Sequence, residues 1–173
     1  MIDVNLIEII PSVLTPDECN ILNKWVLDNH NTNIFQKGRV ANNRKTTRFT
    51  NDIEYDYPDL IVNTFKKIKE KLNFLKNENV PQGKDGIICA ISFNGSKLEK
   101  HLDPKYEDTE SLHFIIKTSS ADDGGDLIIN DVIYKIKEGD CLYFFASIHP
   151  HETNILNCIT HRIVWINGIK VKL

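Results

Sequence analysis

The chain has 173 residues, of which 41% are hydrophobic and 26% are charged, and its formal net charge is −3. This balance fits one folded domain over residues 1–173 and excludes a disordered chain or a generic binder of polyanions. No apolar run approaches the roughly 20 residues that cross a bilayer, and the N-terminus lacks the basic start of a signal peptide. The four cysteines form no C-x-x-C pair. We therefore expect a cytoplasmic protein with reduced thiols and neither a membrane nor a nucleic-acid partner.

The N-terminal part, about residues 1–80, carries helical signals. Thr15-Pro16-Asp17-Glu18 offers an N-cap hydroxyl, a proline at the first helical position and a glutamate at the third. This capping box, with the apolar spacing behind it, predicts a helix over about Pro16–Asn29. A second apolar stripe predicts a helix over about Pro58–Phe74. Between them, Phe35–Phe49 has five cations and no acid, and we interpret it as a polar loop whose arginines could contact a substrate.

From Gly86 to the end, short apolar runs alternate with turn residues, which is typical of strands. The predicted strands are Ile87–Phe93, Leu112–Thr118, Asp126–Ile129, Val132–Ile136, Cys141–Phe145 and Ile159–Ile169. Closely spaced strands after two helices favour a mainly β protein with N-terminal α-helices (α+β). We expect a barrel or jelly roll over about residues 86–173 with the helices packed on one sheet.

A histidine and an aspartate lie two positions apart in His101-Leu102-Asp103. In an extended segment the two side chains point to one face. Together they make two thirds of the facial triad of two histidines and one carboxylate that holds non-haem Fe(II). Taken alone the pair is weak evidence, because chance supplies roughly 0.5 such pairs in a chain of this composition.

Two later segments strengthen this interpretation. Asp123-Gly124-Gly125-Asp126 is a tight turn that leads into a strand, and Arg162 lies eleven residues beyond His151. In the strand around Arg162, Ile163 and Trp165 would pack against the helices, so that Arg162 points into the barrel. A guanidinium in a barrel interior needs an anionic partner, and a carboxylate bound through two hydrogen bonds would satisfy it.

The ordered set of H-x-D, a Gly-Gly-Asp turn, a distal histidine and an arginine about ten residues later resembles the Fe(II)/2-oxoglutarate dioxygenases, and specifically the prolyl 4-hydroxylase-like group. The resemblance covers nearly the whole chain, since residues 9–22 also look like that group's first strand and helix. It implies a double-stranded β-helix (a jelly-roll or cupin-like barrel), with His101, Asp103 and His151 as iron ligands. Arg162 would bind the distal carboxylate of 2-oxoglutarate.

The resemblance implies an enzyme that couples oxidative decarboxylation of 2-oxoglutarate (2OG) to succinate with hydroxylation of a C–H bond. Its cofactors would be Fe(II), 2OG as cosubstrate and O2, and the sequence leaves binding of ascorbate as an extra reductant open. The favoured substrate is a prolyl residue in a peptide or protein. A free amino acid or another small molecule stays open as the alternative.

Several positions depart from the group's pattern or compete with the assigned ligands. A tyrosine is usual three residues before the glycine aligned with Gly95, but Ser92 stands there with Phe93 beside it. His149 competes with His151 as the distal ligand, and the spacing to Arg162 favours His151. His161 replaces the usual small residue before the arginine, and we expect it outside the barrel. We expect His113 to be a structural histidine of a strand.

Three other functions share part of this pattern. His149-Pro150-His151 is an H-x-H pair, as in cupins, but it comes late in the chain. Nucleic-acid demethylases of the superfamily usually have a second arginine six residues after the first, where this chain has Gly168. A non-catalytic barrel would be expected to lose a ligand or the arginine, and all four residues are present.

Overall fold

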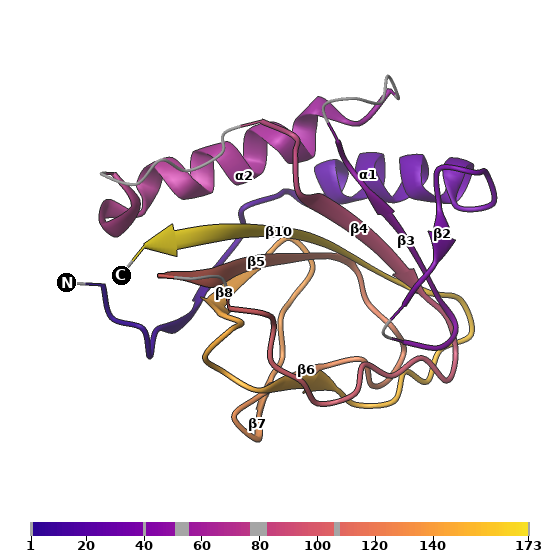
Figure 1. Cartoon of the computed structure of the whole chain (residues 1–173). Helices are drawn as coiled ribbons and strands as arrows, with labels where there is room; N and C mark the ends of the chain where they lie inside the picture. Colours follow the sequence, from indigo (N-terminus) through magenta and orange to yellow (C-terminus); the bar gives the residue numbers. More distant parts are fainter. Residues whose placement is uncertain (1, 40, 51–55, 77–82, 106–107, 173) are drawn as a thin grey trace.

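The structure is a computed structural model, and it describes residues 2–39, 41–50, 56–76, 83–105 and 108–172. These residues form two antiparallel sheets that face each other, with helices on the outer side of the larger one (Figure 1). In spatial order the larger sheet contains β1 (Ile7–Ile10), β8 (Cys141–Phe145), β5 (Thr109–Ser119), β10 (Arg162–Lys172), β4 (Ile87–Ser92), β3 (Arg44–Arg48) and β2 (Gln36–Lys37). The smaller sheet contains β7 (Val132–Tyr134), β6 (Leu127–Ile129) and β9 (His151–Thr153). The predicted jelly roll with helices on one sheet is confirmed.

Helix α1 (Pro16–Asn29) has the predicted bounds and the predicted cap. The Thr15 hydroxyl accepts a hydrogen bond from the Glu18 N–H, and the Glu18 carboxylate accepts one from the Thr15 N–H. Helix α2 (Asp59–Lys71) ends earlier than predicted, and a short 3-10 helix (Asn73–Leu75) follows it. No helix among the described residues is long and apolar enough to cross a membrane.

The sheet has two faces with separate cores. Phe114, Ile163 and Trp165 point outward and pack with α1 and α2 in the larger core. Ala90, Ile115 and Val164 point inward, where they form the smaller core with residues of β6 and β8. The alternation along β10 therefore places Ile163 and Trp165 on the helix side, as predicted from the sequence.

The prediction of a loop over Phe35–Phe49 was wrong. Most of that segment is a hairpin of β2 and β3, and β3 pairs with β4 from Arg44–Ser92 to Arg48–Ile88. A run of basic and hydroxyl side chains lacks the apolar alternation that marks a strand in sequence. Its strand conformation comes instead from the backbone hydrogen bonds that β4 offers along a free edge.

The remaining differences concern strand ends and one short strand that was not predicted. β10 begins at Arg162 and reaches Lys172, whereas the prediction ran from Ile159 to Ile169. β5 is longer than predicted at both ends, and β9 was not predicted as a strand. In β9 the backbone pairs with β6, Ile129 opposite His151, so it is fixed by a partner distant in sequence.

Candidate metal centre and its anion subsite

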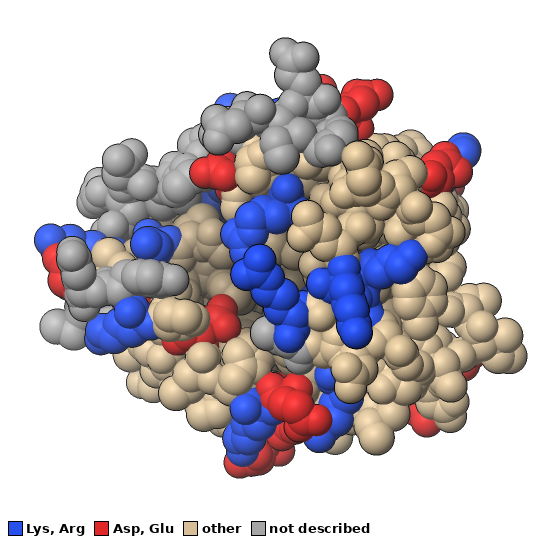
Figure 2. Space-filling model, turned by 45° about the vertical axis from the view of Figure 1, so that its right-hand side comes forward, with Lys and Arg blue, Asp and Glu red and all other residues tan. Residues whose placement is uncertain are grey.

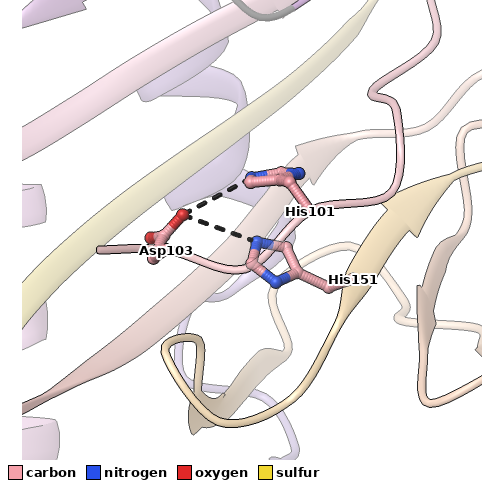
Figure 3. Close-up of side chains that lie close together, drawn as sticks. All are labelled: His101, Asp103 and His151. Carbon is pink, nitrogen blue, oxygen red and sulfur yellow. Dashed lines mark ion pairs between the residues drawn. The ribbon is translucent and has the colours of Figure 1, made fainter. Parts of the chain in front are cut away.

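Backbone pairing brings His101 and Asp103 beside β9, although they lie about fifty positions before it in the chain. His101 and His151 form an isolated antiparallel bridge, in which each backbone N–H donates to the other residue's carbonyl at 3.1 and 2.9 Å. The Asp103 N–H donates to the Ala146 carbonyl at 3.0 Å. The short segment that carries the H-x-D pair is therefore anchored at both ends, and its side chains meet His151 between the sheets (Figure 3).

Both imidazole rings are held by their Nδ1 atoms. The Nδ1–H of His101 donates to the Glu99 carbonyl at 2.7 Å, and that of His151 donates to the His149 carbonyl at 3.1 Å. A carbonyl oxygen only accepts, so the proton is on Nδ1 and the lone pair of the neutral ring is on Nε2. The same arrangement fixes the tautomer and orientation of metal-binding histidines in general.

The free ligand atoms of the three residues converge. The Oδ1 atom of Asp103 lies 3.4 Å from Nε2 of His101 and 4.0 Å from Nε2 of His151. One ligand atom from each residue falls within 4.8 Å of the other two. Two imidazole nitrogens and one carboxylate oxygen are the donor set of a non-haem Fe(II) site with open positions. The chemistry and spacing of these residues therefore fit Fe(II).

The electrostatics of the cluster keep the ligands ready for a cation. Burial lowers the pKa of His151 to about 4, so its ring is neutral at pH 7. At Asp103 burial raises the pKa, but the hydrogen bond from His113 and the nearby histidines outweigh it, and the net pKa is lowered. A neutral imidazole and an ionised carboxylate are the forms that bind a metal.

The sequence interpretation expected His113 to be a structural histidine of a strand, and it did not foresee that His113 contacts Asp103. It lies on β5 with its side chain facing inward, and its Nε2–H donates to Oδ2 of Asp103 at 2.9 Å. The two oxygens of Asp103 thus have different neighbours: Oδ2 bonds to His113, and Oδ1 faces the other two histidines. Gly168, which pairs with His113 across the strands, leaves room for the ring, because a Cβ there would lie 2.9 Å from Nε2 of His113.

His149 does not join the cluster. Its Nε2–H donates to the Val4 carbonyl at 2.9 Å, and its Nδ1 accepts from the Asn130 side-chain amide at 2.9 Å. Both ring nitrogens are therefore committed to structural hydrogen bonds, and the ring is buried. The H-x-H pair presents one histidine to the cluster and the other to the N-terminal segment, which argues against a cupin-type metal site.

Arg162 lies at the start of β10 on the inner face, with only 9% of its surface exposed. Its side chain passes over Gly125, where a Cβ would lie 2.8 Å from Cδ of Arg162 and 2.5 Å from Leu156. The glycine also has a φ of +69°, which other residues rarely adopt. No carboxylate among the described residues forms an ion pair with Arg162, so a buried guanidinium faces the barrel without an anionic partner.

The residues that depart from the family pattern occupy different faces. Ser92 pairs with Arg162 and shares the inner face with Ala90. Phe93 packs instead on the helix-side core, with its ring 6.0 Å from that of His30. His161 precedes β10, and its pKa is lowered by burial and by His30. Neither Ser92 nor Phe93 supplies a phenol to the barrel.

Comparison with known proteins finds similarity at the level of structure. No protein-family model and no curated protein matches the chain in sequence. Among solved structures, a viral collagen prolyl hydroxylase from Paramecium bursaria Chlorella virus-1, in complex with 2OG, is 17% identical with a TM-score of 0.71, and the match covers 95% of this chain and 96% of that one. A Pseudomonas putida prolyl-4-hydroxylase is 14% identical with a TM-score of 0.68, and the match covers 96% of this chain and 92% of that one.

A third similar structure is a prolyl hydroxylase from Trichoplax adhaerens in complex with a peptide fragment of the hypoxia inducible factor oxygen degradation domain. It is 16% identical with a TM-score of 0.71, and the match covers 96% of this chain and 83% of that one. At these identities the comparison establishes a shared fold. The fold expected from the H-x-D, Gly-Gly-Asp and arginine pattern is thereby confirmed.

Proposed function

We propose that the chain is an Fe(II)- and 2OG-dependent oxygenase that hydroxylates a C–H bond, with a prolyl residue of a peptide or protein as the substrate. One observation carries the proposal: a convergent triad of His101, Asp103 and His151 shares the barrel interior with an arginine, Arg162, that has no carboxylate partner among the described residues. A metal-binding triad and an anion-binding cation on the inner side of one barrel match a cosubstrate with a 2-oxo acid at one end and a carboxylate at the other.

In this proposal each residue has a defined task. His101 and His151 would bind Fe(II) through Nε2, and Asp103 through Oδ1, the oxygen that His113 leaves free. Arg162 would bind the distal carboxylate of 2OG and orient the cosubstrate. When bound, Fe(II) supplies the oxidising chemistry, in which O2 and 2OG are consumed, succinate and CO2 are released and the substrate gains a hydroxyl group.

The walls of the barrel would exclude water from this chemistry. Phe144 of β8 lies with its ring centroid 5.1 Å from that of His151 in an edge-to-face arrangement. Ile129 and Leu142 are buried in the same inner core. Apolar neighbours on this side of the cluster strengthen the electrostatic interactions of the ligands, because they lower the local dielectric constant.

A peptide substrate is supported by an open cleft next to the metal centre. The cleft has a volume of about 350 Å³ and is lined by Lys37, Gly38, Arg39, Ala41, Asn42, Gly95, Lys97 and Glu99. Glu99 both lines it and holds the His101 ring through its carbonyl. In Figure 2 the molecule is turned so that the side carrying β2 and β3 faces the reader, and Lys and Arg side chains gather on this face. Two of the three structural relatives above are named as acting on collagen or as bound to a peptide.

The test is turnover of 2OG by the purified chain with Fe(II) and O2, with and without proline-containing peptides. We expect succinate, and with a productive peptide a mass gain of one oxygen atom on proline. Asp103→Ala is the matched control and should give only the background of free iron. Succinate formation no higher in the wild type than in Asp103→Ala, with every peptide tried, would overturn the proposal. Turnover with free amino acids alone would overturn the peptide substrate while leaving the reaction class in place.

A further inference from the structure

A second arginine lies beside Arg162 on the inner face of the larger sheet. Ser92 of β4 is paired on one side with Arg162 of β10 and on the other with Arg44 of β3. Residues directly opposite each other in antiparallel strands project from the same face. Because Ala90, two positions from Ser92, packs in the inner core, this face is the interior one. The register therefore forms a row of arginine, serine and arginine across three neighbouring strands.

The Arg44 side chain is half-buried, and one of its donors has no partner in the part of the chain that the structure describes. Its Nε atom is buried and has no hydrogen-bond partner among the described residues. Gly38 packs directly on its stem, since a Cβ at Gly38 would lie 3.3 Å from Cβ and Cγ of Arg44. An unpaired buried donor on a charged group costs free energy, and a bound anion would satisfy it.

The two guanidinium groups also repel each other. Burial and the nearby Arg44 together lower the pKa of Arg162 to about 10, and Asp126 offsets this only in part. On the other side of Arg162, the pKa of Lys117 is lowered by burial and by Arg162, while Asp126, Glu138 and Asp140 oppose the shift. Without an anion, this gathering of positive charge destabilises the folded state.

We propose that Arg44 is a second arginine of the subsite for the distal carboxylate, so that Arg44 and Arg162 bind one carboxylate from the two sides of Ser92. The inference rests on the proposed function, and it names a residue that the family pattern does not assign. Arg44 contributes charge and hydrogen bonds next to Ser92, where this chain lacks the usual tyrosine. The subsite therefore selects 2-oxo acids that carry a second carboxylate over those that do not.

The test is calorimetric titration of the full chain, loaded anaerobically with Mn(II), with 2OG and with pyruvate, which lacks the distal carboxylate. For Arg44→Met we expect 2OG affinity to fall at least 30-fold while pyruvate affinity changes less than twofold. Arg44→Lys keeps the charge but loses the planar two-pronged hydrogen bonding of a guanidinium, so its affinity for 2OG should fall less, between about threefold and 30-fold. Arg48→Met, an exposed arginine of the same strand, is the control and should leave both affinities within twofold of the wild type.

Thermal unfolding of the metal-free protein supplies an independent readout. Arg44→Met should unfold at a higher temperature than the wild type, because the repulsion of Arg162 is removed, and 2OG should stabilise the Mn(II)-loaded variant less. If Arg44→Met or Arg44→Lys folds and binds 2OG within threefold of the wild type, the inference is overturned and the proposed function stands. If the Mn(II)-loaded wild type binds no 2OG, the proposed function fails and the inference with it.

Discussion

His149 and His151 stand two positions apart, yet their hydrogen bonds give them separate roles. The carbonyl of His149 holds Nδ1 of His151, while the ring of His149 bonds to Val4 and Asn130. One histidine is thus a structural support of the other. The partner Val4 lies 145 positions away in the chain, so the sequence could favour His151 only by the local Pro-His-Glu and by the spacing to Arg162.

His113 illustrates the same limit at the metal centre. In sequence it is one polar residue in a strand, and it was expected to be merely structural. In the structure, its bond to Oδ2 of Asp103 holds the carboxylate with Oδ1 toward the other two histidines. The contact arises because β5 passes beneath the segment of residues 101–103, which no local pattern reveals.

We predict that His113→Leu weakens Mn(II) or Fe(II) binding about 10- to 100-fold, the usual effect of removing a partner that orients a metal ligand. His113→Gln can still donate to Asp103 and should recover part of the affinity. Anaerobic metal titration measures both variants. Gly168→Ala should act in the same direction, because its methyl group would displace the His113 ring. Unchanged metal affinity in His113→Leu would show that Asp103 needs no such support.

At the scale of elements, sequence patterns predicted correctly those helices and strands whose conformation depends on neighbouring residues. The capping box and apolar stripe of α1 act within a few residues, and its bounds agree with the prediction. The strand β8 was predicted equally well, since its apolar run is continuous. β3 was mistaken for a loop because its sequence, Arg44-Lys45-Thr46-Thr47-Arg48, forms a strand only through its pairing with β4. Arg44 was therefore not placed in the barrel from the sequence.

The cap of α1 yields a prediction at this scale. Thr15→Ala removes the hydroxyl that accepts from the Glu18 N–H and should lower the free energy of unfolding by about 1 kcal/mol. Because α1 lies on the outer side of the larger sheet (Figure 1), away from the metal centre, affinity for Mn(II) and 2OG should stay within twofold of the wild type. Urea denaturation and calorimetry test the two parts. A loss of affinity for Mn(II) or 2OG in Thr15→Ala would contradict this and show that α1 affects ligand binding.

At the scale of the whole molecule, the larger sheet has a core on each face. The helices pack on the outer face, and the residues of the candidate site lie on the inner face. The helix-side core contains the large aromatic residues Trp165, Phe49 and Phe65, and the inner core is smaller and opens onto the charged residues of the site. Length and composition predicted one folded domain, and the order of helix and strand signals predicted its class, but neither predicted this separation, because it follows from which strands face each other.

The buried thiols provide a prediction for the whole fold. Burial raises the pKa of Cys19 to about 11, and burial also raises the pKa values of Cys89 and Cys141. In the unfolded chain these thiols ionise near pH 9, whereas in the folded chain they stay protonated. The folded state then binds more protons, so the free energy of unfolding falls as the pH rises above 9, by up to about 1.4 kcal/mol per pH unit for each thiol.

Cys141→Val isolates one of these contributions from other groups that titrate in alkali, such as Lys69, whose pKa burial lowers to about 8. Between pH 10 and 11 the variant should lose stability less steeply than the wild type, by about 1.4 kcal/mol per pH unit. Urea denaturation at a series of pH values gives both slopes. Equal slopes would mean that Cys141 ionises as readily in the folded protein as in the unfolded chain.

The central claim is that the barrel interior holds both a three-residue Fe(II) site and a 2OG site. The most direct test is anaerobic titration of the metal-free protein with Fe(II) and then 2OG, followed by visible absorption. We predict a charge-transfer band that needs both Fe(II) and 2OG, is absent in Asp103→Ala, and fades on admission of O2 as succinate forms. If Fe(II) binds the wild type but 2OG produces no band at any concentration, 2OG does not bind at the iron, and the proposed oxygenase chemistry is contradicted.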